Sequence, residues 1–137
     1  MAGPDNDAER ACERLIIQFA HYLDHRRFTE VAALFAEDGV WLRHGEQLVG
    51  PQAIRSLLEQ RSATQVERHV MTTVLVEQAS PTECTAVSYV LIFRAHGPDP
   101  HGQLPKVGEF HDRFSLTPHG WRFAFRTSLP AFAGDSQ

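Results

Sequence analysis

Four long segments rich in β-branched and aromatic residues fill the second half of the chain and constrain its fold most. Turn-forming Pro, Gly, Asp and Ser residues separate them, which is typical of strands joined by hairpins. Hairpins join antiparallel neighbours, so the pattern predicts a largely antiparallel sheet. The predicted strands cover residues 66–77, 83–96, 106–117 and 121–129.

The first half of the chain has helical periodicity instead. From residue 5 to about residue 26, apolar residues recur at intervals of three and four, which predicts an amphipathic helix. A shorter periodic run follows over 28–35, and a short strand is predicted over 40–43. A third helix should begin at Gly50-Pro51, since proline is tolerated in a first helical turn. Helices followed by strands predict an α+β fold.

The predicted strand 83–96 is apolar on both faces. One face carries Thr85, Val87, Tyr89, Leu91 and Phe93, and the other carries Cys84, Ala86, Ser88, Val90 and Ile92. A sheet that is dry on both faces must be covered on both. The helices can cover one face, so we expect a homodimer in which a second copy covers the other. The alternative is a strand that twists out of this alternation.

Length and charge exclude several classes of protein. A chain of 137 residues predicts one domain over 1–137. Its net charge is −4 and its basic residues are scattered, which argues against nucleic-acid or anionic-membrane partners. Cys12 and Cys84 cannot form a disulfide framework. With a polar, acidic N-terminus and no long apolar run, the sequence predicts a soluble cytoplasmic protein.

Eight histidines raise the question of a metal site. His21 and His25 are spaced four apart, which places both on one face of a helix. Zinc-binding helices with this spacing carry a glutamate after the first histidine, whereas Tyr22 follows His21 here. No third ligand is evident nearby. We therefore predict no metal and no other cofactor.

Three polar residues fall where a core is expected. Asp24 stands near the end of the first helix, where a carboxylate opposes the helix dipole. Taken alone, it is a surface residue or a cap for the helix that opens at Phe28. Asp112 alternates with Phe110 and Phe114, and its structural alternative is an ion pair with an arginine of the last strand, Arg126 or Arg122. A buried charge must be paired or must line a wet pocket.

His69 is the third of these residues and lies inside a predicted strand. Strict alternation places it on the face of Met71, Thr73 and Leu75 and opposite Val70, Val74 and Val76. A lone strand histidine is often a hydrogen-bonded packing residue, which is the alternative to a catalytic role.

Several phrases of the sequence together resemble the SnoaL-like group of the nuclear-transport-factor-2-like superfamily, over about Glu9 to Leu129. They are Tyr22-Leu-Asp24, the segments 33–41 and 50–54, Arg68-His69-Val-Met-Thr-Thr, and the segments 86–89, 108–114 and 120–126. The resemblance implies a cone-shaped, highly curved, mostly antiparallel sheet wrapped around three N-terminal helices. It also implies an enclosed apolar pocket and a common dimeric state.

Two enzymes of this superfamily, scytalone dehydratase and hexachlorocyclohexane dehydrochlorinase, use an Asp–His pair. By resemblance, that pair matches Asp24 and His69, and a last-strand arginine of the dehydrochlorinase matches Arg126. Phe19 stands where the dehydrochlorinase has a basic residue, which disfavours dehalogenation. The steroid isomerases of the superfamily carry their base near 41–43, where this chain has no carboxylate.

The resemblance and the residues together predict a cofactor-independent lyase or isomerase that acts on a small hydrophobic, cyclic or polyketide-like compound. His69 would be the general base, Asp24 would orient it, and Arg126, or Tyr89 if it faces inward, would stabilise a developing negative oxygen. We predict that the substrate contacts Tyr22, Trp41, Met71, Tyr89, Phe110 and Asp112.

A second hypothesis assigns no chemistry to the chain. A non-catalytic ligand-binding protein is consistent with the same resemblance, and so is a scaffold subunit similar to the β subunit of ring-hydroxylating dioxygenases. One fold serves many functions, so the fold cannot separate these hypotheses. The set formed by Asp24, His69 and Arg126 favours the enzyme, because a scaffold has no need of all three.

Overall fold

The computed structural model describes residues 6–98 and 104–132. Within that part of the chain, three helices and six strands form the predicted α+β fold, a curled and mostly antiparallel sheet with three helices. The elements are α1 (Asn6–Asp24), α2 (Phe28–Ala33), β1 (Phe35–Arg43), β2 (Glu46–Val49), α3 (Pro51–Leu58), β3 (Gln65–Ser80), β4 (Glu83–His96), β5 (Lys106–Thr117) and β6 (Gly120–Pro130).

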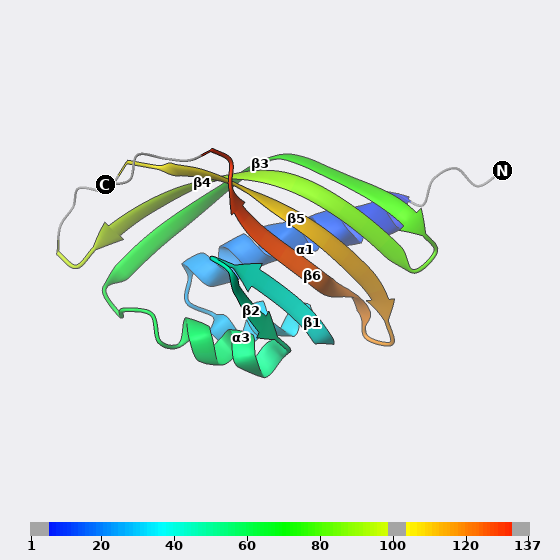
Figure 1. The fold of residues 1–137 in the computed structure, drawn as a ribbon, viewed down its shortest axis with the longest axis horizontal. Coiled ribbons are helices and arrows are strands. Elements are labelled where there is room, and N and C mark those ends of the chain that lie inside the picture. Colours follow the sequence, from blue (N-terminus) through cyan, green and yellow to red (C-terminus); the bar gives the residue numbers. More distant parts are fainter. Residues whose placement is uncertain (1–5, 99–103, 133–137) are drawn as a thin grey trace.

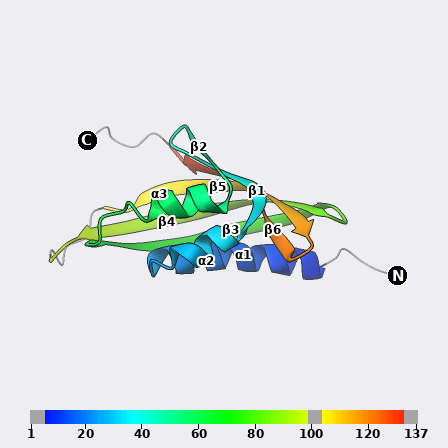
Figure 2. The same cartoon turned by 90° about the horizontal axis from the view of Figure 1, so that it is seen from below.

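The sheet has the strand order β2-β1-β6-β5-β4-β3. All neighbouring strands are antiparallel except β1 and β6, which run parallel. The sheet arches over α1, and α3 lies with the β1–β2 hairpin below the arch (Figure 1). Seen from below, α1 runs alongside β3 (Figure 2). The concave side of the sheet is therefore the one that the helices cover.

The apolar stripe of α1 forms the centre of the core. Phe19 is 1% exposed, and its ring makes edge contacts with those of Trp41, Phe110 and Phe123, at centroid distances of 5.2, 5.9 and 6.0 Å. Such edge contacts between aromatic rings are favourable beyond the area they bury. The first helix and the sheet are thus joined through one aromatic cluster.

The end of α1 is fixed by its backbone. Arg26 has a φ of 59°, and the Arg27 N–H donates to the Tyr22 carbonyl at 2.8 Å. A left-handed residue followed by this bond is how many helices close. The closure places Asp24 in the last turn of α1, beside β3. The first predicted helical residue, Asp5, lies outside the described residues.

Three elements of the first half differ from the sequence prediction: α2, β2, and β1, which begins at Phe35 instead of residue 40. The run over 28–35 ends earlier as a helix, because Phe35 already belongs to β1. Strand β2 was not predicted, since four residues are too few to show a period. The sequence signal for β2 was the glycine of His44-Gly45, which suits a two-residue hairpin turn. In the structure these two residues have φ values of 49° and 75°.

The two faces of β4 are now distinguished. Cys84, Ala86, Ser88 and Val90 are buried on the concave side. Tyr89 and Phe93 point to the convex side, where they are 43% and 42% exposed. The convex face thus holds large apolar side chains that the single chain leaves in water.

Strand β3 departs from simple alternation. Thr73 has a φ of 50°, and the pairing with β4 shifts register between Thr72 and Leu75. Such a bulge inserts an extra residue into one strand and turns the following side chains over. As a result, His69 shares the inner face with Met71 as predicted, but Leu75 is 60% exposed and Val76 is buried. The prediction that Thr73 and Leu75 share the face of His69 was wrong because alternation cannot reveal a bulge.

We expect Thr73→Gly to stabilise the protein by about 1 kcal/mol, because glycine adopts a positive φ without the strain of a β-branched residue. Thr72→Gly, at the exposed neighbouring position, should instead destabilise by about 0.5–1 kcal/mol, the usual cost of glycine within a strand. Urea unfolding of the two variants measures the difference. Equal losses would contradict a left-handed backbone at Thr73.

Candidate active site

An Asp–His pair joins the end of α1 to β3. The Asp24 Oδ1 and His69 Nδ1 atoms are 2.5 Å apart, and the His69 backbone N–H donates to Asp24 Oδ2 at 2.9 Å. The side chains of Asp24 and His69 are 7% and 5% exposed. Because an ionised carboxylate can only accept, Nδ1 carries the hydrogen of this bond. Nε2 of His69 is left without a hydrogen bond from the described residues.

The local fold explains why a carboxylate occupies this unfavourable position. β3 is an edge strand, so some of its N–H groups lack a strand partner. Asp24 satisfies one of them and binds the imidazole with its other oxygen. No side chain caps α2, whose N-cap residue is Arg27, so Asp24 does not serve as that cap. Nor is Asp24 a surface residue.

A cavity of about 440 Å³ lies beside the pair. Its apolar wall includes Phe19, Leu23, Trp41, Val90 and Phe110, and His69 is part of its lining. The Trp41 indole N–H donates to Ser128 Oγ at 2.9 Å, which fixes the ring against β6. The volume falls in the range of sites for small molecules, about 300–1,000 Å³.

The structure brings some of the predicted site residues to the cavity and leaves others elsewhere. His69, Trp41 and Phe110 line it. Tyr22 lies partly buried against the core with the Arg27 guanidinium 4.7 Å from its ring centre, and Met71 also packs against the core. Tyr89 lies on the convex face. None of these last three side chains lines the cavity.

Asp112 and Arg126 form an ion pair behind the cavity wall. Arg126 Nε is 3.0 Å from Asp112 Oδ1, and both side chains are 0% exposed. This is the ion pair that the sequence offered as the structural alternative for Asp112. Burial raises the pKa of Asp112 to about 6 although Arg126 lies beside it, and burial lowers the pKa of Arg126 to about 10. Neither residue lines the cavity.

Three phenylalanine rings surround the Arg126 guanidinium. Its central carbon lies 3.6 Å from the ring centre of Phe110, 4.2 Å from that of Phe19 and 4.7 Å from that of Phe123. A desolvated guanidinium is attracted to aromatic faces. Phe19 and Phe110 also line the cavity, so they separate the guanidinium from it.

The sequence analysis missed a charged network at one end of the cavity. The buried Glu67 carboxylate contacts the guanidinium of Arg61 and accepts hydrogen bonds from Nη2 and Nε of Arg94 at 2.5 and 2.8 Å. Burial alone would raise the pKa of Glu67, but the two arginines lower it below its ordinary value. The available signal was position, since Glu67 precedes His69 by two residues on the same face of β3.

The described ranges contain no cluster of three or more His, Cys, Asp or Glu side chains suited to a metal ion. Within the same ranges, no helix is both long and apolar enough to cross a membrane.

A curled sheet around a partly apolar cavity, with the histidine of an Asp–His pair in the lining, is the arrangement that defines the class of this protein. The chain belongs to the SnoaL-like domain family, whose model matches residues 5–127. No curated protein matches the chain in sequence.

Three solved structures from Novosphingobium aromaticivorans have a similar fold. A candidate scytalone dehydratase is 23% identical to this chain, with a TM-score of 0.81. The matched region covers 94% of this chain and 87% of the dehydratase chain. An NTF2-like protein with a cystatin-like fold is 18% identical with a TM-score of 0.79, covering 95% and 86%. The β subunit of a candidate aromatic-ring-hydroxylating dioxygenase is 17% identical with a TM-score of 0.79, covering 94% and 92%. At these identities the similarity establishes the fold.

The Asp112–Arg126 pair gives a stability prediction. Asp112→Leu or Arg126→Met alone leaves one buried charge without its partner, so each should cost about 3–5 kcal/mol of unfolding free energy. The double variant removes both charges and should recover most of that loss. Urea unfolding of the four proteins measures the coupling. Losses that simply add in the double variant would show that the pair does not interact.

Proposed function

We propose that the protein is a cofactor-independent lyase or isomerase that removes a proton from a small hydrophobic, cyclic or polyketide-like carbonyl compound. The observation that carries this proposal is the buried Asp24–His69 pair at the wall of the cavity. The Asp24 carboxylate holds the Nδ1–H of His69, which leaves Nε2 as the basic atom. A positioned base of this kind is what proton abstraction requires.

In the proposed mechanism, His69 Nε2 takes a proton from the carbon next to the carbonyl group. The imidazolium that forms is stabilised by Asp24, which also fixes the ring orientation, as an aspartate does in hydrolase triads. The imidazolium then returns its proton to a leaving oxygen or to another carbon. Dehydration, cyclisation and double-bond migration share this first step and differ only in the second.

Arg126, the predicted stabiliser of negative charge on the carbonyl oxygen, has no such role in this mechanism, because it does not line the cavity and pairs with Asp112. Its guanidinium lies behind Phe19 and Phe110, and its terminal nitrogens have no hydrogen-bond partner in the described part of the chain. Of the predicted substrate contacts, this proposal keeps Trp41 and Phe110, which line the cavity, and not Tyr22, Met71, Tyr89 and Asp112, which do not line it.

The dyad is tested by proton exchange, which needs no knowledge of the product. Cyclic ketones incubated with the protein in D₂O should lose the NMR signal of their acidic C–H. Asp24→Asn and His69→Gln should slow this exchange by about 10²–10⁴-fold, the usual contribution of a general base. His119→Gln, at an exposed histidine of the β5–β6 turn, is the matched control. Full exchange by His69→Gln would refute the mechanism.

A second candidate function is a scaffold or ligand-binding role. The likeness to a dioxygenase β subunit and the exposed convex face favour it. For the enzyme, we propose instead that a second copy of the chain covers this face, giving a homodimer. We also propose a cytoplasmic location, in which the buried side chains of Cys12 and Cys84 would stay as thiols.

Sedimentation separates the two candidates. We expect the purified protein to sediment as a homodimer. The double variant Val70→Asp/Phe93→Asp, which places two charges on the convex face, should sediment as a monomer. Val49→Asp, at an exposed position of β2, should stay dimeric. Co-purification of the native protein with a larger subunit, and no homodimer, would favour the scaffold.

A further inference from the structure

One end of the cavity is cationic. The side chains of Arg43, Arg61, Arg94 and Lys106 line the same cavity as His69 and its apolar wall. Glu67 is the carboxylate buried among them. Glu109 also belongs to the lining, but its carboxylate lies 3.1 Å from His111 Nε2, and His111 is exposed. The cationic groups therefore outnumber the acidic groups that face them.

Glu67 is already fully engaged. One carboxylate oxygen contacts Arg61, and the other accepts two hydrogen bonds from Arg94. The carboxylate side chain is 4% exposed, so it is unavailable to a further cation. It holds Arg61 and Arg94 in place and neutralises one of their two charges.

Arg43 makes no close ion pair with a carboxylate of the described residues, although Glu46 lies opposite it on β2. No ion pair within 4.0 Å joins Arg43 to any of residues 6–98 or 104–132, and its guanidinium lies 5.1 Å from the ring centre of Trp41. Burial lowers the pKa of Arg43 and the nearby Arg61 lowers it further, and the opposing effects of Glu46 and Glu67 do not restore it to its ordinary value. A partly desolvated cation with cationic neighbours gains free energy from binding an anion.

We propose that this end of the cavity binds a carboxylate group of the substrate, with Arg43 as its main partner. The planar guanidinium fork matches a carboxylate in a bidentate arrangement. This inference rests on the proposed function for the reacting position, but the binding site is tested without turnover. The substrate class is an aromatic or alicyclic carboxylic acid whose ring lies against Phe19, Trp41 and Phe110.

The test compares two probes of equal shape, 2-naphthoate and neutral 2-naphthamide, by titration calorimetry. The native protein should bind the naphthoate at least ten times more tightly. Arg43→Gln should weaken naphthoate binding by about 10–100-fold, the usual loss for a charge-assisted hydrogen bond, and change naphthamide binding by less than about threefold. Arg43→Lys keeps the charge but loses the planar guanidinium. Its affinity for naphthoate should lie between those of the native protein and of Arg43→Gln.

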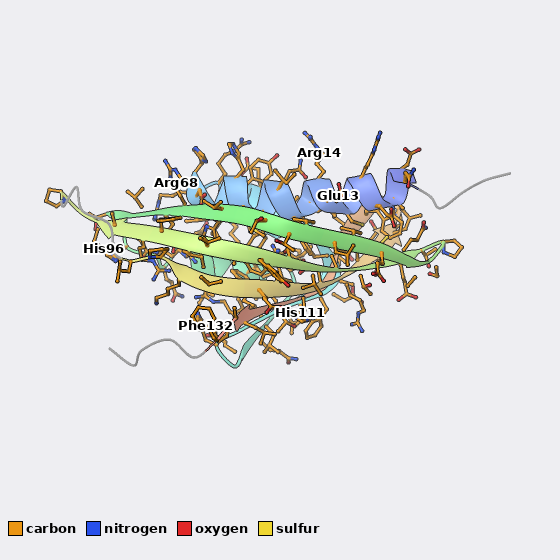
Figure 3. All side chains as sticks on the ribbon, turned by 90° about the horizontal axis from the view of Figure 1, so that it is seen from above. Glu13, Arg14, Arg68, His96, His111 and Phe132 are labelled. Atoms are coloured by element: carbon orange, nitrogen blue, oxygen red, sulfur yellow. The ribbon has the colours of Figure 1, made fainter. Side chains whose placement is uncertain are left out.

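Two controls make the outcome decisive. Arg14→Gln has the same charge change at an exposed residue of α1 whose side chain points away from the sheet (Figure 3), and it should bind both probes like the native protein. His69→Gln should keep the preference for naphthoate, so failure of the proposed chemistry would leave this site intact. Equal affinity of the native protein for both probes would overturn the proposal. So would equal weakening of both by Arg43→Gln in a variant with native urea stability.

Discussion

The carboxylate of Asp24 is the interaction on which the site depends. It binds both the backbone and the ring of His69, and thereby fastens the last turn of α1 to the edge strand of the sheet. A carboxylate at a helix C-terminus is unfavourable by itself, and a buried one is costly unless its oxygens are satisfied. Here two N–H groups of one residue satisfy it. The same contact that joins helix and sheet also determines which imidazole nitrogen faces the cavity.

The bulge at Thr73 allows β3 to serve both the site and the core. Before it, Glu67 and His69 face the cavity side, and after it Val76 is buried in the core. With strict alternation, Leu75 would face inward in place of Val76. Every second residue along the whole of β3 would then have to suit the inner face. An extra residue removes that requirement. The strained φ of Thr73 is a local cost that keeps both halves of a long edge strand facing inward.

The sequence predicted those parts that depend on period and order. The helices and the long strands follow from the spacing of apolar residues, and the strands at 83–96 and 106–117 agree with the structure to the residue. The pairing of Asp24 with His69 came from resemblance, because no period links a helix end to a strand 45 residues later. The Glu67 network and the bulge were missed for a related reason. Ion pairs between loop and strand residues depend on side-chain paths, and a positive φ at a threonine leaves no mark in the pattern.

The placement of charge explains how one small interior serves as both core and pocket. Asp112 and Arg126 neutralise each other in a dry environment, and the Arg126 guanidinium supports the Phe19 and Phe110 rings from behind. Glu67 and its arginines line the cavity itself, at its cationic end. Between the two charged groups, the wall beside His69 is apolar. If His69 is the base that we propose, apolar neighbours limit the competition of water for its free nitrogen. The buried charges thus lie behind the cavity wall or at one end of the cavity, and the wall beside His69 stays apolar.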